Sequence, residues 1–121
     1  MNKIEFLNAA RLLIEKPENF TTGDWARDVE GNSVDVEDPT ATCFCTLGAM
    51  RKIAVSKEDW HTKCEVETYL YNYANAYGMT TAAFNDINGH KAVLNMFDAI
   101  LDKFNKEETL LKEMSIYEKR S

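Results

Sequence analysis

The 121-residue sequence has few of the residues that mark fibrous, secreted or membrane-spanning proteins. Its five glycines and two prolines exclude a collagen-like or low-complexity polymer. No apolar run approaches the roughly 18 residues that a membrane-spanning helix needs. There are three cysteines, an odd number, and Glu5 stands where a signal peptide would begin its apolar core. These features predict a cytoplasmic protein in a reducing compartment.

Basic residues are also in the minority. The chain has 14 Lys and Arg against 20 Asp and Glu, a formal net charge of −6. This charge disfavours non-specific binding to nucleic acid or to anionic lipid, so we expect neither a nucleic-acid partner nor a membrane partner. With 45% hydrophobic residues, the chain is long enough to bury its own core. We therefore expect residues 1–121 to form a single domain.

The spacing of apolar residues predicts a mainly α-helical fold with four or five helices. The predicted helices span residues 3–16, 39–54, 56–77 and 90–104, with a fifth over 105–121. The turn residues 30–32 separate two short apolar segments, residues 25–29 and 33–36. This arrangement predicts a small β-hairpin inserted after the first helix. Residues 79–89 are expected to form a linker.

Several predicted helix ends carry recognisable signals. Asp38 and Pro39 are expected to begin the second helix, Ser56 to cap the third, and Gly78 to end it. Asn105 is expected to cap the fifth, so that residues 105–121 form an amphipathic C-terminal helix appended to the domain. This helix has a narrow apolar stripe, which predicts a homodimer or loose packing on the domain: Leu110, Leu111, Met114 and Tyr117.

Four side chains of types that bind zinc raise the question of a metal site: Cys43, Cys45, His61 and Cys64. Cys43 and Cys45, two residues apart in a predicted helix, would point to separate sides. The spacing matches no familiar Cys-x-x-Cys knuckle, so we expect no bound metal. The chain also has no Gly-rich phosphate loop, no His-Glu-x-x-His motif and no EF-hand loop. We expect no cofactor.

Cys45, His90 and Asp86 are the residue types of a thiol nucleophile, a base and an orienting acid. The competing interpretation places Cys45 in the core, on one apolar line with Ala41 and Ala49, and places His90 in an exposed helical turn. This second interpretation is favoured. The sequence shows neither a convincing nucleophile nor a convincing set of metal ligands, which favours binding over catalysis. A cysteine hydrolase that uses Cys45 is kept as an alternative.

An acidic stretch over residues 28–38 is opposed only by Arg27. Its five carboxylates could hold a cation or a basic partner: Asp28, Glu30, Asp35, Glu37 and Asp38. A solvated loop explains the stretch as well, because charge runs usually lie at the surface.

Three short runs resemble a family of small bacterial and bacteriophage proteins that carries only a domain-of-unknown-function label. The runs are Phe20-Thr21-x-Gly23-x-Trp25-Ala26-Arg27-Asp28, Pro39-x-Ala41-x-x-x-Cys45-x-x-Gly48-Ala49 and Phe84-Asn85-Asp86. The resemblance covers about residues 4–101 and implies no activity. It directs attention to Trp25, Asp28, Cys45, Gly48, Asn85 and Asp86. Phe44 and Phe84 stand where the family has tryptophan.

The leading interpretation is a non-enzymatic cytosolic binding or interaction protein, a bacteriophage accessory factor acting on a host component. The candidate binding residues are Trp25, Asp28, Asn85 and Asp86. The first alternative is a protein that binds a small ligand, such as a nucleotide, at these residues. A concave pocket there would favour the ligand, whereas an exposed apolar face would favour a protein partner.

Overall fold

The first helix, α1, spans Lys3–Leu13 in the computed structural model, which describes residues 1–120. A capping box closes its first turn, because the Glu5 amide donates to Asn2 Oδ1 at 2.9 Å and the Asn2 amide donates to Glu5 Oε1 at 3.1 Å. The helix ends earlier than the predicted residue 16, and a short 3₁₀ helix, η1 (Pro17–Asn19), follows it. The buried residues of α1, which are Phe6, Leu7 and Ala10, face the core.

The predicted β-hairpin after α1 is confirmed, but its second strand is not the predicted one. Strand β1 (Ala26–Arg27) pairs antiparallel with β2 (Cys43–Phe44), with Ala26 opposite Phe44. Residues 33–36 meet β1 on its other edge only through one isolated bridge, between Arg27 and Ser33. Phe44 is 3% exposed, so the pairing with β2 places a large side chain in the core.

The second helix, α2, spans Thr46–Ile53 and does not begin at Pro39. Asp38 forms a local turn, in which its Oδ1 accepts from the amide of Thr40 at 2.8 Å. Cys45 is therefore the N-cap of α2 and not a residue of its apolar line, which corrects the prediction. Cys43 and Phe44 lie in the first turns of the predicted longer helix, and that helix does not form there because they pair with β1.

The third helix, α3, spans Lys57–Asn75 and begins as predicted, with the Asp59 amide donating to Ser56 Oγ at 3.0 Å. Gly78 follows it with φ of 75°, the left-handed conformation expected after a helix end. Val66, Leu70 and Ala74 are its buried apolar residues. They pack into the core shared with α1 and α4.

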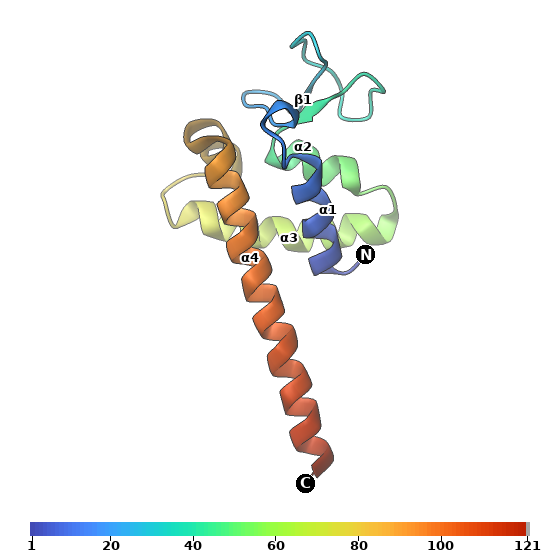
Figure 1. The fold of residues 1–121 in the computed structure, drawn as a ribbon, viewed down its shortest axis with the longest axis vertical. Helices are drawn as coiled ribbons and strands as arrows, with labels where there is room; N and C mark the ends of the chain where they lie inside the picture. The colour runs from blue at the N-terminus through green and yellow to red at the C-terminus, as the bar shows by residue number, and fades with distance from the viewer. Residues whose placement is uncertain (121) are drawn as a thin grey trace.

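The last helix, α4, spans Thr81–Arg120 and bends at Gly89, where φ is 82°. Two predictions are wrong here: residues 79–89 are mostly helical rather than a linker, and no separate helix begins at Asn105. The middle of α4 supplies much of the core, including Phe97 and Phe104. Beyond Phe104 the helix leaves the body of the molecule and continues alone (Figure 1). We call residues 105–119 the arm.

The structure therefore consists of a helical body with a small sheet at one end and the arm at the other (Figure 1). Residue 121 of the predicted C-terminal helix lies outside the described residues. Within residues 1–120, no helix combines the length and the apolar character needed to cross a membrane.

Candidate functional site

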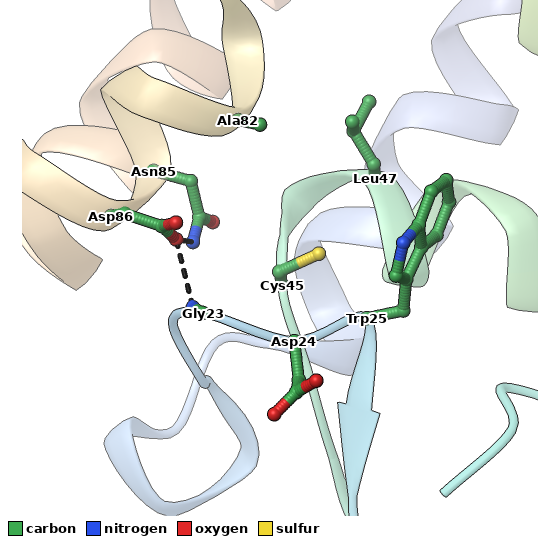
Figure 2. Close-up of a pocket in the computed structure, with 8 residues that line it drawn as sticks. All are labelled: Gly23, Asp24, Trp25, Cys45, Leu47, Ala82, Asn85 and Asp86. Carbon is green, nitrogen blue, oxygen red and sulfur yellow. Dashed lines mark hydrogen bonds between the residues drawn. The ribbon is translucent and has the colours of Figure 1, made fainter. Parts of the chain in front are cut away.

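A hollow of about 150 Å³ opens where three segments of the chain meet (Figure 2). Residues 23–25 form one wall, Cys45 and Leu47 a second, and residues 82–86 of α4 a third. Of the four binding residues predicted from the sequence, the structure brings three to this hollow, namely Trp25, Asn85 and Asp86. The fourth, Asp28, does not line it.

Asn85 holds the three segments together. Its side chain is 1% exposed, and its Oδ1 accepts from the amide of Thr46 at 2.9 Å and from the hydroxyl of Thr46 at 2.8 Å. Its Nδ2 donates to the carbonyl of Thr21 at 3.2 Å and to Asp86 Oδ1 at 3.0 Å. The amide group thus links α4 to the first turn of α2 and to the loop before β1. Its hydrogen-bonding groups are used inside the protein.

Asp86 is exposed at the rim of the hollow. Its Oδ1 accepts from the amide of Gly23 at 3.0 Å as well as from Asn85 (Figure 2). These two contacts fasten the loop before β1 to α4. The carboxylate also places a negative charge near the sulfur of Cys45.

Cys45 faces the hollow from the N-terminus of α2 (Figure 2). Its sulfur accepts from the amide of Gly48 at 3.2 Å. Burial raises the pKa of the Cys45 thiol, the charge of Asp86 acts in the same direction, and the backbone amides of Gly48 and Leu47 oppose the shift. An activated cysteine nucleophile needs a lowered pKa, so this environment favours a neutral, unreactive thiol.

Gly48 explains why α2 can approach β1 so closely. A Cβ atom at this position would lie 2.0 Å from the carbonyl oxygen of Trp25 and 2.9 Å from its carbonyl carbon. The same carbonyl accepts from the amide of Cys45 at 3.2 Å. Only a residue without a side chain allows this contact between two backbones. Gly48 therefore shapes the wall of the hollow that Trp25 and Cys45 form.

His90, the base of the hydrolase alternative, is committed elsewhere. Its Nε2 hydrogen-bonds the carbonyl oxygen of Ile14 at 2.6 Å, and its ring centroid lies 5.0 Å from that of Phe20. The geometry therefore gives the hydrolase alternative no support. Cys43 donates to the carbonyl of Arg27 at 3.6 Å, and Cys64 is exposed. In the part of the chain that the structure describes, no three His, Cys, Asp or Glu residues gather as metal ligands do.

Asp28 builds the turn between β1 and Ser33. Its carboxylate accepts from the amide of Asn32 at 2.9 Å and from the amide of Glu30 at 3.0 Å. These hydrogen bonds, that of Asn32 above all, hold the pKa of Asp28 below its ordinary value. Asp28 therefore shapes the acidic loop, and the hydrogen bonds of its carboxylate lie within that loop.

Trp25 separates the hollow from a second one of about 180 Å³, which Arg51 and Asp35 help to line. The indole is 49% exposed, and the Arg51 guanidinium lies 5.6 Å from the ring centroid. Pockets for small organic ligands usually measure about 300–1,000 Å³. Each hollow is smaller than that range. The site can hold water, an ion or one side chain of a partner more readily than a nucleotide.

The arm carries a group of large, exposed apolar side chains. Its stripe lies on one side of the helix, with exposed fractions of 56% for Leu110, 66% for Leu111, 51% for Met114 and 76% for Tyr117. Sequence periodicity found these four residues. It did not find the hollow of about 260 Å³ at the root of the arm, where Ile4 of α1 faces the arm. We call this space the root hollow.

Comparison with protein families shows a match over most of the chain. A model described as a family of unknown function, DUF6197, matches residues 1–103, so the match ends where the arm begins. Comparisons with the curated proteins and with the solved structures show no match.

Proposed function

Since this chain belongs to DUF6197, a family of unknown function, we propose its activity from geometry: it is a non-enzymatic, cytoplasmic protein-binding protein whose arm is the docking element. The free cysteines, Cys43, Cys45 and Cys64, suit a reducing compartment. A role as a bacteriophage accessory factor acting on a host component stays a prediction from the resemblance.

The observation that carries this proposal is the stripe on the arm. Single exposed apolar residues are common on protein surfaces, but four large ones on one face of an isolated helix mark an interaction surface. Leu110, Met114 and Tyr117 follow each other at four- and three-residue steps, with Leu111 alongside. This spacing is the one by which an amphipathic helix packs against another helix or into a groove.

The small-ligand alternative rests on the hollow at Trp25, Asn85 and Asp86. Its volume of about 150 Å³ and the internal hydrogen bonds of Asn85 favour a structural junction over a pocket for a nucleotide. We therefore prefer protein binding through the arm, because it accounts for the exposed apolar stripe.

The proposal is tested with a photoreactive amino acid on the arm of the full chain, expressed in bacterial cells. Position 114 lies on the stripe, whereas position 116 lies on the opposite side of the same helix. Met114 and Ile116 are matched in exposure, at 51% and 53%. We expect covalent adducts with protein from position 114 and few from position 116. Equal adducts from both positions, or none from position 114, would contradict a docking stripe.

A further inference from the structure

We propose that the hollow beside Trp25 binds an arginine side chain of a partner protein, with the guanidinium stacked on the indole and paired with Asp86. This surface lies at the end of the body away from the arm, so the inference goes beyond the docking function proposed for the arm. Three features carry it: the exposed indole, the charge of the hollow and its volume.

The indole of Trp25 is presented at the surface by a well-ordered backbone. The Trp25 carbonyl accepts from the amide of Cys45 at 3.2 Å, and Gly48 packs directly against that carbonyl. The Trp25 side chain is nevertheless half exposed and has one hollow on each side. Tryptophan is among the residues that contribute most to binding when they lie at protein interfaces. The position therefore suits contact with a partner.

The molecule already places one guanidinium beside this ring. The Arg51 guanidinium lies 5.6 Å from the indole centroid and lines the second hollow, but not the first. In Figure 2 the indole stands on one side of the first hollow, with Asn85 and Asp86 on the other side. A second guanidinium entering the first hollow would therefore reach the ring from the side that Arg51 leaves open.

The charge of the first hollow suits a cation. Two aspartates line it, and none of its described lining residues is Lys, Arg or His. Asp24 is already paired with Arg27 at 2.6 Å, so Asp86 supplies the remaining charge. The Asp86 Oδ1 accepts from Gly23 and Asn85, whereas its Oδ2 has no hydrogen-bond or ion-pair partner within residues 1–120. This oxygen is free to pair with an incoming guanidinium.

An anion suits the hollow less well, although α2 begins there. Free amides at a helix N-terminus attract anions. Here the amide of Thr46 donates to Asn85 Oδ1 at 2.9 Å, and the amide of Gly48 donates to Cys45 Sγ at 3.2 Å. These donors are used within the protein, and the carboxylate of Asp86 repels an anion.

The volume of the hollow fits the end of an arginine side chain. The hollow measures about 150 Å³, and Leu47 and Ala82 give it apolar walls against which methylene groups can pack. An engineered cavity of roughly 150 Å³ binds benzene, whose ring is larger than a guanidinium. The guanidinium is planar and more weakly hydrated than the ammonium of lysine, so it stacks on an aromatic ring more readily. These properties select arginine over lysine.

The test is a titration of the full chain with blocked tripeptides, followed by ¹H–¹⁵N NMR. Trp25 and Trp60 give two indole N–H signals, and the variant Trp60→Phe shows which is which. We expect a glycine–arginine–glycine peptide to shift the Trp25 signal with a Kd of about 1–30 mM, and to leave the Trp60 signal in place. A citrulline peptide, nearly the same in shape but uncharged, should not bind, and a lysine peptide should bind at least about threefold more weakly. Equal binding of citrulline would overturn the recognition of charge, and equal binding of lysine would overturn the choice of arginine.

Two variants test the role of Asp86. Asp86→Asn removes the charge and keeps an oxygen that can accept from the amide of Gly23. We expect it to weaken binding of the arginine peptide about threefold or more. Asp102→Asn is the matched control, because Asp102 is an exposed carboxylate outside the hollow, and it should leave the Kd within about 1.5-fold. An Asp86→Asn protein that binds as tightly as the wild type would overturn the pairing with Asp86.

Free arginine is another source of the same group. We expect free L-arginine to bind no more tightly than the blocked peptide, and tighter binding would overturn a protein side chain as the occupant. A Trp25 signal that shows no saturable shift with up to about 100 mM arginine peptide would overturn the whole inference. The photo-crosslinking at positions 114 and 116 does not involve this hollow, so it tests the proposed function of the arm separately.

Discussion

Replacing Gly48 by alanine tests whether the close approach of α2 to β1 holds the hollow together. Helix propensity alone predicts a gain, because alanine is about 1 kcal/mol better than glycine within a helix. The structure predicts the opposite sign. The new Cβ would lie 2.0 Å from the Trp25 carbonyl oxygen, and that oxygen belongs to the backbone and cannot swing away like a side chain.

The expected size of the effect follows from what must move. Overpacking of this kind costs about 1–3 kcal/mol or somewhat more. Displacing the Trp25 carbonyl also weakens its hydrogen bond from Cys45, now 3.2 Å long, which adds about 1 kcal/mol. After subtracting the gain in helix propensity, we expect Gly48→Ala to lower the free energy of unfolding by about 1–3 kcal/mol.

Thermal unfolding followed by circular dichroism measures this loss. For a chain of this length, the expected fall in Tm is roughly 4–12 °C. Gly78→Ala is a suitable control, because Gly78 has φ of 75° and no atom within 4 Å of the added Cβ. It should cost about 1–2 kcal/mol of left-handed backbone strain without any clash against another segment. A Gly48→Ala protein that unfolds at or above the wild-type temperature would refute the steric reasoning.

Three further predictions concern single residues of the body. Asn85→Leu should lower the free energy of unfolding in urea by about 2–4 kcal/mol, because the buried amide and hydroxyl of Thr46 lose their acceptor, and an unchanged midpoint would contradict this. Cys45 should react with iodoacetamide at neutral pH much more slowly than the exposed Cys64, because burial raises the pKa of the Cys45 thiol; equal rates in timed peptide mapping would contradict it. The pKa of Asp28 is lowered by loop amides, so its stabilising effect is complete above its unfolded-state pKa and is lost as pH falls through the folded-state value. Asp28→Asn should therefore destabilise the protein at neutral pH and differ less from wild type in strong acid, as measured by urea unfolding at each pH.

Local signals in the sequence were sufficient where the structure is locally determined. Ser56 caps α3 and Gly78 follows its end, because each acts through its own backbone neighbours. The stripe on the arm could also be found from the sequence, because the spacing of apolar residues along an isolated helix does not depend on distant segments. These parts of the fold depend on no distant partner.

The prediction failed where distant segments compete with local pattern. Ala41, Cys45 and Ala49 have helical spacing, yet pairing with β1 turns residues 43–44 into a strand and makes Cys45 a cap. Asn85 lies in the segment predicted to be a linker, residues 79–89, because that segment is rich in turn-forming residues. It is buried in a helix because its partners Thr21 and Thr46 are far away in the sequence. The candidate binding residues came from the family resemblance, and periodicity could not have found them.

The absence of a break at Asn105 makes the arm a rigid extension of the core. Because α4 runs continuously from the buried Phe97 and Phe104 into the arm, the direction in which the stripe faces is set by the helical phase of the core. Inserting one residue after Phe104 would rotate the stripe by about 100° around the helix axis and move it about 1.5 Å outward. Inserting seven would move it about 10 Å outward but turn it by only about 20°. Evolution can therefore lengthen this arm in whole heptads at little cost in orientation, whereas a single inserted residue turns the stripe away from the root hollow.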